Sequence, residues 1–526
     1  MFRQQSQGGY NPWLVAVVVS MATFMEVLDT SIANVSLNHI AGGMAASLNE
    51  STWVLTSYLV SNAVILPISG WLASVMGRKR FYMTCVALFT CSSLLCGLAP
   101  TLGWLVAFRV LQGIGGGGLA PSEQSILADA FPPQKRGQAF AVYGIAVVVA
   151  PAIGPTLGGW ITDNFSWRWI FFINVPVGIL SLVLTYHMLH ESAQAIAEHR
   201  AAIRGGIKVD YIGFGLIAMG LGCLQVVLDK GQEDDWFSSS FICAFALASA
   251  IGLIGGILWE LTIDKPIVDL PLLKRRNFAL TNIVMFSMGF ILFGTTQLLP
   301  QYTQSLLGYT ATQAGLMISP GGFCVMAMMP VVGFLVGRVQ PRYLVAFGML
   351  VEALAMYNMT HFDTQVPFST LAWARVYQAF GLAFLFVPIN TAAYSDLPPG
   401  KNNNASALMN LSRNLGGSVG VSLANTMLFR RSQLHQNILV STPSMSGPEY
   451  LNNLHIIAAN MVRQGMNSSI ALQHAAAVIN NTMEKQAEML SYLDVFRFMA
   501  GASLMMVFVA LILTKIPLGR KMAAGH

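Results

Sequence analysis

Apolar runs of about 20 residues recur along nearly the whole chain and constrain its fold more than any other feature. A hydrocarbon core about 30 Å thick needs roughly 20 apolar residues as an α-helix, because every backbone polar group must be satisfied within the segment. Of the 526 residues, 54% are hydrophobic and 10% are charged, whereas soluble proteins carry about 25% charged residues. The composition excludes soluble domains, intrinsic disorder and a disulfide scaffold, and it predicts an all-α polytopic membrane protein.

Fourteen runs are long enough to span a membrane. They lie at 13–33, 52–74, 81–99, 102–122, 138–162, 168–189, 211–228, 239–262, 278–299, 315–337, 342–360, 368–391, 405–428 and 495–514. An even number places both termini on one side, and the bias of basic residues toward alternate short loops predicts that this side is the cytoplasm. The basic residues are Arg3, Arg78, Lys79, Arg80, Lys135, Arg136, Arg200, Arg204, Lys208, Lys265, Lys274, Arg275, Arg276, Arg338, Arg342, Lys401, Lys515, Arg520 and Lys521.

The segment 429–494 is the one long stretch between predicted spans, and by parity it forms an external loop. Its apolar spacing predicts an amphipathic helix within 470–490. Two interpretations remain open, a self-packed external cap and a docking surface for a partner. The apolar positions are Ile470, Ala477, Val478 and Met483.

The chain contains an internal repeat. Arg-Val-Leu-Gln-Gly at 109–113 recurs 266 residues later as Arg-Val-Tyr-Gln-Ala at 375–379, and the Asp-Ala-Phe-Pro motif that starts at Asp129 has a counterpart at Asp396. Two parallel six-helix halves are the architecture of secondary transporters that rock around a central site. The predicted domains are a first half at 1–190, two inserted helices with their flanking loops at 191–276, and a second half at 277–526 that includes the loop 429–494.

Five motifs point to one family. They are Leu-Asp-Thr-Ser-Ile-Ala-Asn-Val at 28–35, Gly-Trp-Leu-Ala-Ser-Val-Met-Gly-Arg-Lys-Arg at 70–80, Arg-x-x-Gln-Gly at 109–113, Ala-Pro-Ala-Ile-Gly-Pro-Thr-Leu-Gly-Gly at 150–159, and Trp-Arg-Trp-Ile-Phe-Phe-Ile-Asn-Val-Pro at 167–176. Together they resemble the major facilitator superfamily in its fourteen-helix drug:proton antiporter branch, most closely the EmrB-type exporters. The resemblance implies the major facilitator fold, with two six-helix halves and two inserted linker helices.

Three charged residues inside the spans are predicted to couple proton movement to transport. A charge within a span costs about 2.5–3.5 kcal/mol on insertion scales, so it marks a functional site. Glu26 and Asp29 lie three residues apart on nearly the same helical face, and Asp29 occupies the family's motif position. The resemblance implies that Arg109 assists proton transfer, with a carboxylate or carbonyl of the first span as its partner. The alternatives are a helix-packing acid for Asp29, a substrate contact for Glu26 and a structural tie for Arg109.

Further embedded polar residues are predicted to line the substrate cavity or to extend this network. Two more acids inside spans, Glu123 and Glu352, form a second tier without an assigned role. The predicted cavity and network residues are Thr23, Thr30, Asn34, Gln112, Arg375 and Arg413.

Span five carries the residues that resemble the antiporter motif. Its prolines remove backbone hydrogen bonds and its glycines remove side-chain bulk, which predicts a kinked, closely packed surface where the two halves meet. These residues are Pro151, Gly154, Pro155, Gly158 and Gly159.

The turn after span two is predicted to form a cytoplasmic gate, built from Gly70, Gly77, Arg78 and Arg80. Two interpretations are open: the basic turn holds the cytoplasmic face closed in one state, or it only reflects the bias of basic residues toward cytoplasmic loops. The family usually has an aspartate where this chain has Ser74, which leaves a charge relay at this gate in doubt.

These features predict a proton-coupled exporter of hydrophobic or amphipathic compounds, in the inner membrane of a bacterium. The alternatives are a dedicated exporter of one metabolite or fatty acid and a membrane scaffold or sensor that does not transport. No P-loop motif is present, which argues against an ATP-driven pump, and the glycine run at 113–118 follows no strand, which argues against nucleotide binding. No cysteine lies at metal-ligand spacing from a histidine or another cysteine, and the scattered basic residues form no face for nucleic acid, so we expect no enzyme activity, cofactor, metal or nucleic-acid partner. The resemblance further implies a periplasmic adaptor protein and an outer-membrane channel as partners, with resistance to antibiotics as the outcome.

Overall fold

The computed structural model describes residues 11–191, 193–204, 210–263, 266–398, 400–441 and 448–515, and every regular element in these ranges is a helix. Among the basic residues used to predict orientation, those outside the described ranges are Arg3, Lys208, Lys265, Arg520 and Lys521. Helices satisfy their backbone polar groups within the segment, as lipid requires. The all-α prediction is therefore confirmed for the described residues.

The helices follow one another with short connections. The first group comprises α1 (Pro12–Val35), α2 (Leu37–Gly43), α3 (Leu48–Ser51), α4 (Trp53–Met76), α5 (Arg78–Leu98), α6 (Leu102–Gly116), α7 (Leu119–Ala130), α8 (Arg136–Asn164), α9 (Trp169–Phe172) and α10 (Asn174–Met188). The middle elements are α11 (Ala193–Arg204), α12 (Tyr211–Lys230), η1 (Trp236–Ser238), α13 (Ser240–Thr262) and η2 (Leu270–Lys274). The second group comprises α14 (Arg276–Ser305), α15 (Ala311–Leu335), α16 (Pro341–Met359), α17 (Phe368–Ala393), α18 (Asn402–Ser441), α19 (Pro448–Arg463) and α20 (Ser468–Leu511).

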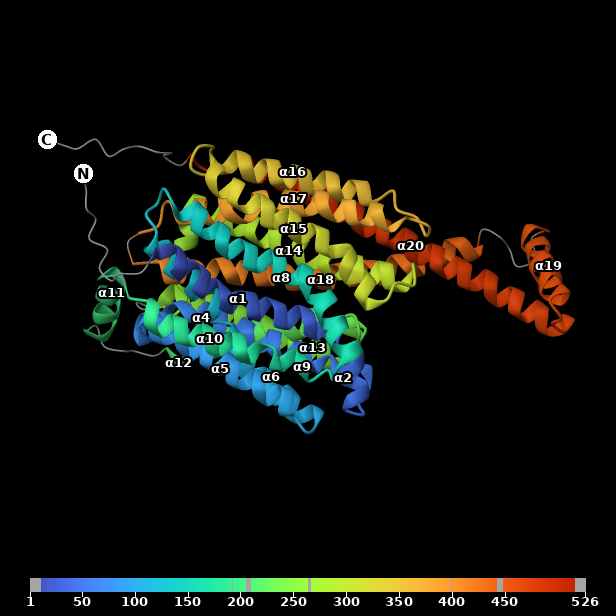
Figure 1. Ribbon diagram of the computed structural model, residues 1–526, viewed down its shortest axis with the longest axis horizontal. Helices are drawn as coiled ribbons and strands as arrows, with labels where there is room; N and C mark the ends of the chain where they lie inside the picture. The colour runs from blue at the N-terminus through green and yellow to red at the C-terminus, as the bar shows by residue number, and fades with distance from the viewer. Residues whose placement is uncertain are drawn as a thin grey trace.

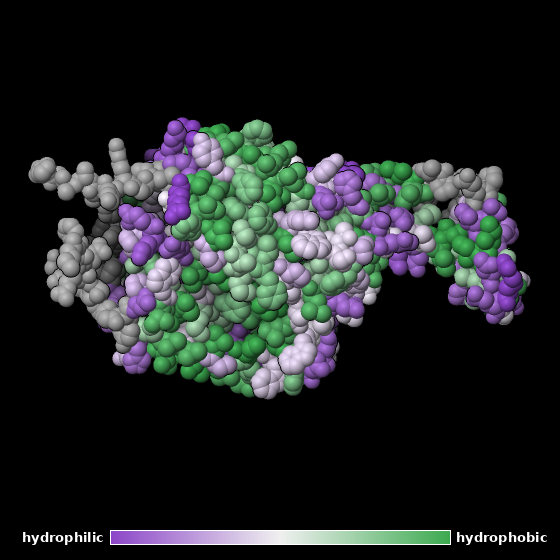
Figure 2. Space-filling view, turned by 45° about the horizontal axis from the view of Figure 1, so that its top comes forward, coloured by the Kyte–Doolittle hydropathy of each residue, from purple (hydrophilic) through white to green (hydrophobic). Residues whose placement is uncertain are grey.

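Eleven stretches of helix among the described residues are long and apolar enough to cross a membrane. Figure 2 shows a broad band of hydrophobic side chains across the middle of the molecule, with hydrophilic side chains toward its two ends. Eleven of the fourteen predicted spans are thus confirmed by length and composition. The other three fall on α6 and α7, which break at Gly117, on α16, which contains Arg342 and Glu352, and on α18, which opens with three asparagines.

The two groups occupy the lower and upper parts of the bundle in Figure 1. Within the first, α1 packs against α8 and α10; within the second, α14 packs against α18, and α16 packs against α17 and α20. The groups meet where α8 packs against α15 and where α4 packs against α18. The helix α18 begins 266 residues after α8, and α15 contains Gly-Phe-Leu at 333–335, which matches Gly-Trp-Leu at 70–72 of α4. The pair α4 and α18 is therefore the repeat-related equivalent of the pair α15 and α8.

The inserted helices lie beside the first group. The helix α12 packs against both α13 and α4, and its Asp229 accepts a hydrogen bond from Thr56 of α4. The Ser418 hydroxyl of α18 donates to Gln225 Oε1 of α12 at 2.8 Å. The insertion therefore contacts both groups of helices.

The described residues of 429–494 are mostly helical, so the helix expected within 470–490 is part of a longer helical segment, and the external position of the segment stays a prediction. The helix α18 continues to Ser441, and α20 is a single helix from Ser468 to Leu511. The first part of α20 projects away from the bundle, and α19 lies beside that projecting end (Figure 1). The helix predicted within 470–490 is confirmed, and three of the four apolar residues named for it lie on its exposed face, so the contact with α19 uses other residues. Ile470, Ala477 and Val478 are exposed. Small side chains let α19 approach closely, so the buried contact uses Ala458, Ala471 and Ala475.

Candidate functional site

Asp29 lies at the centre of a buried hydrogen-bond network in the first group. Its Oδ2 accepts from Arg109 Nη1 at 2.5 Å, and its Oδ1 accepts from Gln112 Nε2 at 3.1 Å and from Asn174 Nδ2 at 2.7 Å. Arg109 and Gln112 come from α6 and Asn174 from α10, so two helices supply donors to this carboxylate of α1. The predicted pairing of Arg109 with a carboxylate of the first span is confirmed, whereas the proton-coupling roles stay predictions.

The guanidinium of Arg109 is fully enclosed. Its Nε donates to the Val54 carbonyl at 3.0 Å, its Nη1 also donates to Gln112 Oε1 at 2.8 Å, and its carbon lies 4.4 Å from the Tyr58 ring centroid. A buried cation needs a close counter-ion and hydrogen-bond acceptors to be tolerated. Arg109 has both, which fixes the position of Asp29 relative to α4 and α6.

The glycines of the antiporter motif hold α1 against α8. A Cβ at Gly158 would lie 2.9 Å from Ile32 Cγ2, and a Cβ at Gly154 would clash with Ser31, two residues from Asp29. On its other side, Gly159 lies close to Thr312 of α15 in the second group. Both motif prolines, Pro151 and Pro155, lie inside α8. The motif therefore lies between the Asp29 network and the second group.

Glu26 lies one turn before Asp29 and has different partners. Its Oε1 accepts from Asn62 Nδ2 at 3.1 Å and from the Tyr58 hydroxyl at 3.3 Å, both on α4. Asn414 of α18 donates to Asn62 Oδ1 at 3.3 Å. Glu26 is therefore connected to the second group, whereas the Asp29 network lies within the first.

Glu123 of α7 contacts the middle of α1. It is fully buried, and its Oε1 accepts from the backbone amide of Thr23 at 3.0 Å and from the Tyr82 hydroxyl at 3.4 Å. Sequence reasoning placed Glu123 only in a second tier. The break at Gly117, which starts a new helix, brings this acid to α1 and was not visible in the apolar pattern.

Other residues predicted for the cavity do not gather in one place. Asn34 is exposed near the end of α1, and the Thr30 hydroxyl donates to the Val27 carbonyl of its own helix at 2.9 Å. Arg375 forms its hydrogen bonds within the second group, to Gln378 at 2.5 Å and to Thr296 at 3.3 Å.

Arg413 of α18 lies at the boundary between the groups. Its side chain is 5% exposed, and its Nε and Nη1 form no hydrogen bond with a described residue. The charge of Arg413 acts on Glu26 of α1, and Arg413 also interacts with Tyr143 of α8. Glu26 of the first group and Arg413 of the second group thus interact electrostatically, although they form no direct ion pair among the described contacts.

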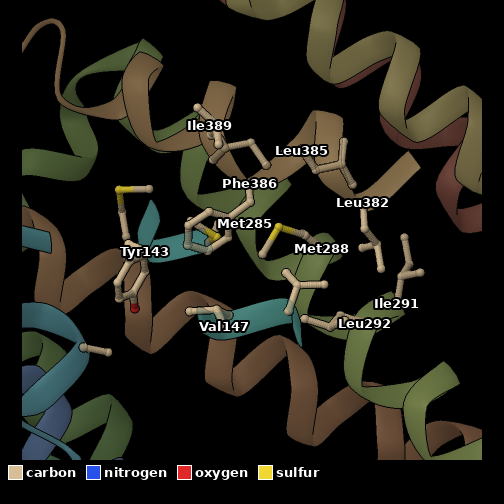
Figure 3. Close-up of a cluster of buried hydrophobic side chains, with 14 of the residues drawn as sticks. Tyr143, Val147, Met285, Met288, Ile291, Leu292, Leu382, Leu385, Phe386 and Ile389 are labelled. Carbon is tan, nitrogen blue, oxygen red and sulfur yellow. The ribbon is translucent and has the colours of Figure 1, made fainter. Parts of the chain in front are cut away.

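Apolar side chains continue from Tyr143 into the second group. In Figure 3, Tyr143 and Val147 of α8 lie beside Met285 and Met288 of α14 and Phe386 of α17. The ring centroids of Tyr143 and Phe386 are 5.4 Å apart. Methionine side chains are flexible and polarizable, so they adapt to apolar ligands of different shape. The boundary therefore combines a charged region with an adaptable apolar one.

The basic turn takes its carboxylate from Asp129, which sequence reasoning missed. Arg78 forms an ion pair with Asp129 of α7, and Asn402 of α18 donates to Asp129 Oδ1 at 2.7 Å. The turn itself depends on Gly77, whose φ of +85° is strained for other residues. Asp129 thus joins the turn to the second group, although position 74 holds a serine where the family usually has an aspartate. The signal that could have identified it was the repeated Asp-Ala-Phe-Pro motif.

The remaining predicted gate residues differ in position. A Cβ at Gly70 would lie 3.0 Å from the Asn403 carbonyl oxygen of α18, so Gly70 lies in the contact between the groups. Arg80 is exposed and lies outside the Asp129 contacts. The gating role of all four residues stays a prediction.

Comparison with known proteins identifies the family. The sequence profile of the Major Facilitator Superfamily matches residues 19–421, a range that contains both groups of helices up to α18. The chain belongs to the major facilitator superfamily and is a multi-pass membrane transporter.

Two relatives and one solved structure illustrate the similarity. The multidrug export protein EmrB of Escherichia coli strain K12 is 36% identical over 508 residues, which are 96% of each chain. The fatty acid resistance protein FarB of Neisseria gonorrhoeae is 38% identical over 515 residues, which are 97% of each chain. A double tryptophan mutant of the transporter XylE has a TM-score of 0.62 at 13% identity, covering 96% of this chain and 97% of that one, which shows the shared fold.

Proposed function

We propose that this protein is a proton-coupled antiporter that exports hydrophobic or amphipathic compounds by alternating access. The observation that carries the proposal is the buried Asp29 carboxylate, held by Arg109, Gln112 and Asn174. An ionisable acid is costly inside a membrane protein and marks a functional site by default. The relatives named as multidrug export proteins support the same class of substrate.

Proton uptake at Asp29 changes the contact between α1 and α6. The ionised carboxylate balances the charge of Arg109, and a proton removes that balance. Breaking a buried pair costs about 3–5 kcal/mol when one charge is left uncompensated. Protonation therefore favours a different arrangement of α1, and α8 transmits the change because Gly154 and Gly158 hold it against α1.

The substrate binds at the boundary between the groups. The apolar cluster around Tyr143 and the methionines of α14 accepts the apolar part of a ligand, and Glu26 accepts a cationic or hydrogen-bonding part. Because Glu26 also interacts with Arg413 of α18, a ligand at this place competes with the contact between the groups. Substrate binding and proton binding then favour opposite arrangements, which is the requirement for exchange.

The proposed organisation follows the sequence prediction. Residues 1–190 and 277–526 form the two moving halves, and 191–276 supply the inserted helices. Both termini lie in the cytoplasm of a bacterial cell, and the protein lies in the inner membrane. The Asp129 contacts with Arg78 and Asn402 then form the cytoplasmic gate.

The projecting segment 429–494 is the proposed contact for a periplasmic adaptor protein, which connects the exporter to an outer-membrane channel. In the bundle orientation proposed above, α19 and the start of α20 extend on the external side (Figure 1). Exposed apolar residues remain there after α19 packs against α20, including Ile456, Val462 and Val478. These give a partner an apolar surface to bind.

A dedicated exporter of fatty acids is the second candidate. The relative FarB is named as a fatty acid resistance protein. The guanidinium of Arg413, buried with Nε and Nη1 unpartnered, is suited to a carboxylate head group. A scaffold without transport is disfavoured, because a scaffold gives no reason to keep buried acids within the spans.

Drug-dependent proton movement tests the proposal. The purified protein is placed in liposomes that contain a pH-sensitive dye, and either ethidium or dodecanoate is added. We expect proton flux with wild type and with the exposed control Glu484→Gln, and loss of flux with Asp29→Asn. Proton flux with ethidium supports broad export. Proton flux with dodecanoate but not with ethidium supports the fatty acid exporter. If neither probe moves protons, or if Asp29→Asn retains full flux, the proposed coupling is wrong.

A further inference from the structure

The second group contains a polar network that repeats the geometry around Asp29. Arg375 Nη1 donates to Gln378 Oε1 at 2.5 Å, and Gln378 Nε2 donates to Thr295 Oγ1 at 2.6 Å. Thr295 lies 266 residues after Asp29, the same separation as Arg375 from Arg109. The repeat has therefore kept the arginine and the glutamine, but a threonine stands where the first half has its acid.

A carboxylate reaches this network from another helix. Glu352 of α16 is fully buried and interacts electrostatically with Arg375 of α17. The two helices approach closely at Gly381, where a Cβ would lie 3.0 Å from Glu352 N and 3.2 Å from Glu352 Cγ. The absence of a side chain at Gly381 lets Glu352 lie directly against α17.

Glu352 lacks the close contacts that hold Asp29. Neither carboxyl oxygen accepts a hydrogen bond of good geometry from a described residue, and Arg375 Nε also has no such partner. The Gln378 side chain and the Leu382 backbone amide interact with Glu352 more weakly than the charge of Arg375 does. A buried carboxylate is costly unless it is hydrogen-bonded and closely paired. Asp29 has three donors, so the two acids differ in how firmly their ionised forms are held.

Arg375 links Glu352 to the contact between the groups. A Cβ at Gly321 of α15 would lie 2.9 Å from Arg375 Cγ, and α15 packs against α8. A shift of α15 along α8 therefore moves Arg375 relative to Glu352. Among the described residues, Arg375 is the one ionisable group whose charge acts on Glu352, although α20 also packs against α16.

We propose that Glu352 is a second proton-binding residue of the transport cycle, in the half opposite Asp29. This inference rests on the proposed proton-coupled export. The Glu352 carboxylate takes one proton from water on the external side and returns it to water on the cytoplasmic side, so that one O–H bond forms and breaks in each cycle. The ionised form attracts Arg375, and the protonated form leaves Arg375 to Gln378 and Thr296. One transported molecule then exchanges for two protons.

Two measurements test this proposal. Infrared spectroscopy of the purified protein, recorded across a pH titration, follows the carboxylic acid C=O signal without any substrate. In liposomes, an imposed membrane potential and an imposed pH gradient are varied until net ethidium flux stops. The values at that balance point give the number of protons exchanged per ethidium molecule. The variants are Glu352→Gln, the conservative Glu352→Asp, and the exposed control Glu484→Gln on α20.

We expect Glu352→Gln to remove one titrating signal and to halve the ratio from two protons to one. Glu352→Asp shifts the signal and keeps the ratio of two, which separates proton binding from a structural role even if Glu352→Gln does not fold. The proposal is overturned if the titration is unchanged in the Glu352 variants, or if the ratio is equal in wild type and Glu352→Gln. If wild type moves ethidium without protons, the proposed antiport fails first, and the infrared titration still decides whether Glu352 exchanges a proton.

Discussion

Asp29 and Arg109 form an ion pair whose Oδ2 and Nη1 atoms are 2.5 Å apart, with side chains 1% and 0% exposed. The pair joins α1 to α6 in a place that water does not reach. In such a place, removal of one partner leaves an uncompensated charge, whereas replacement of both partners does not. Stability therefore depends on charge balance, and the proposed proton exchange depends on an ionisable acid at position 29.

The first prediction separates these two properties. Arg109→Gln lowers the free energy of unfolding by about 3–5 kcal/mol, because it leaves Asp29 buried without its cation. The double variant Asp29→Asn with Arg109→Gln regains most of that loss but no longer exchanges the proton that binds at Asp29 in liposomes. Thermal unfolding in detergent measures the stability. A double variant less stable than Arg109→Gln alone would show that the pair is needed for more than charge balance.

The second prediction concerns Asp129. Asp129→Ala removes the acceptor shared by Arg78 and Asn402, and hydrogen bonds to charged groups are worth about 1.5–3 kcal/mol each. We expect the α4 to α5 turn to separate from α18 in a larger fraction of molecules. Spin labels at exposed Met76, at the end of α4, and at exposed Ser395, in the connection from α17 to α18, report this separation in a background without native cysteines.

The control for Asp129→Ala is Asp234→Ala, which removes an exposed carboxylate in the turn before η1. We expect the control to keep the distance distribution of the parent protein. Identical distributions for Asp129→Ala and Asp234→Ala would contradict a closing role for the Asp129 contacts.

Sequence reasoning found the Asp29 network because charges within apolar runs are rare and each one stands out. It named Asp29, Arg109 and Gln112 together. It included Asn174 only as part of a family motif and did not name Asn402, and their partners lie 145 and 273 residues away in the chain. Amides do not stand out in a polar helix end, and only the assembled helices bring them to their acids.

The same limit applies to helix boundaries and faces. An apolar run does not reveal the break at Gly117, so Glu123 was not expected to contact α1. The exposed face of α20 has larger apolar residues than the buried one, so a pattern of hydrophobicity selected Ile470 and Val478 instead of Ala471 and Ala475. Close approach between helices depends on small residues, and the periodicity of large hydrophobic residues does not identify them.

The third prediction tests the antiporter motif as a contact surface. Gly158→Val places a branched side chain against Ile32, where even a Cβ would lie 2.9 Å from Ile32 Cγ2. Overpacking costs about 1–3 kcal/mol and displaces α1 together with Asp29. We expect lower thermal stability and slower proton-coupled transport.

The matched control is Gly215→Ala in α12, because a Cβ there meets nothing within 4 Å. Alanine favours the helix over glycine by about 1 kcal/mol, so this variant is expected to be neutral or slightly more stable. Equal behaviour of Gly158→Val and Gly215→Ala would show that α8 does not hold α1 as the distances indicate.

The last prediction concerns the contact between α19 and α20. Ala471 and Ala475 are fully buried there, and Ala475→Glu places a charge in an apolar contact, at a cost of several kcal/mol. We expect α19 to detach and trypsin to cleave faster at Arg463, while Ala477→Glu, two residues away on the exposed face, leaves cleavage unchanged. Transport in liposomes is expected to continue in both variants, because this contact lies outside the Asp29 network. If cleavage is equal in the two variants, the alanine contact does not hold α19; if Ala475→Glu stops transport in liposomes, the projecting segment acts on the transport cycle itself and its role is more than attachment of an adaptor.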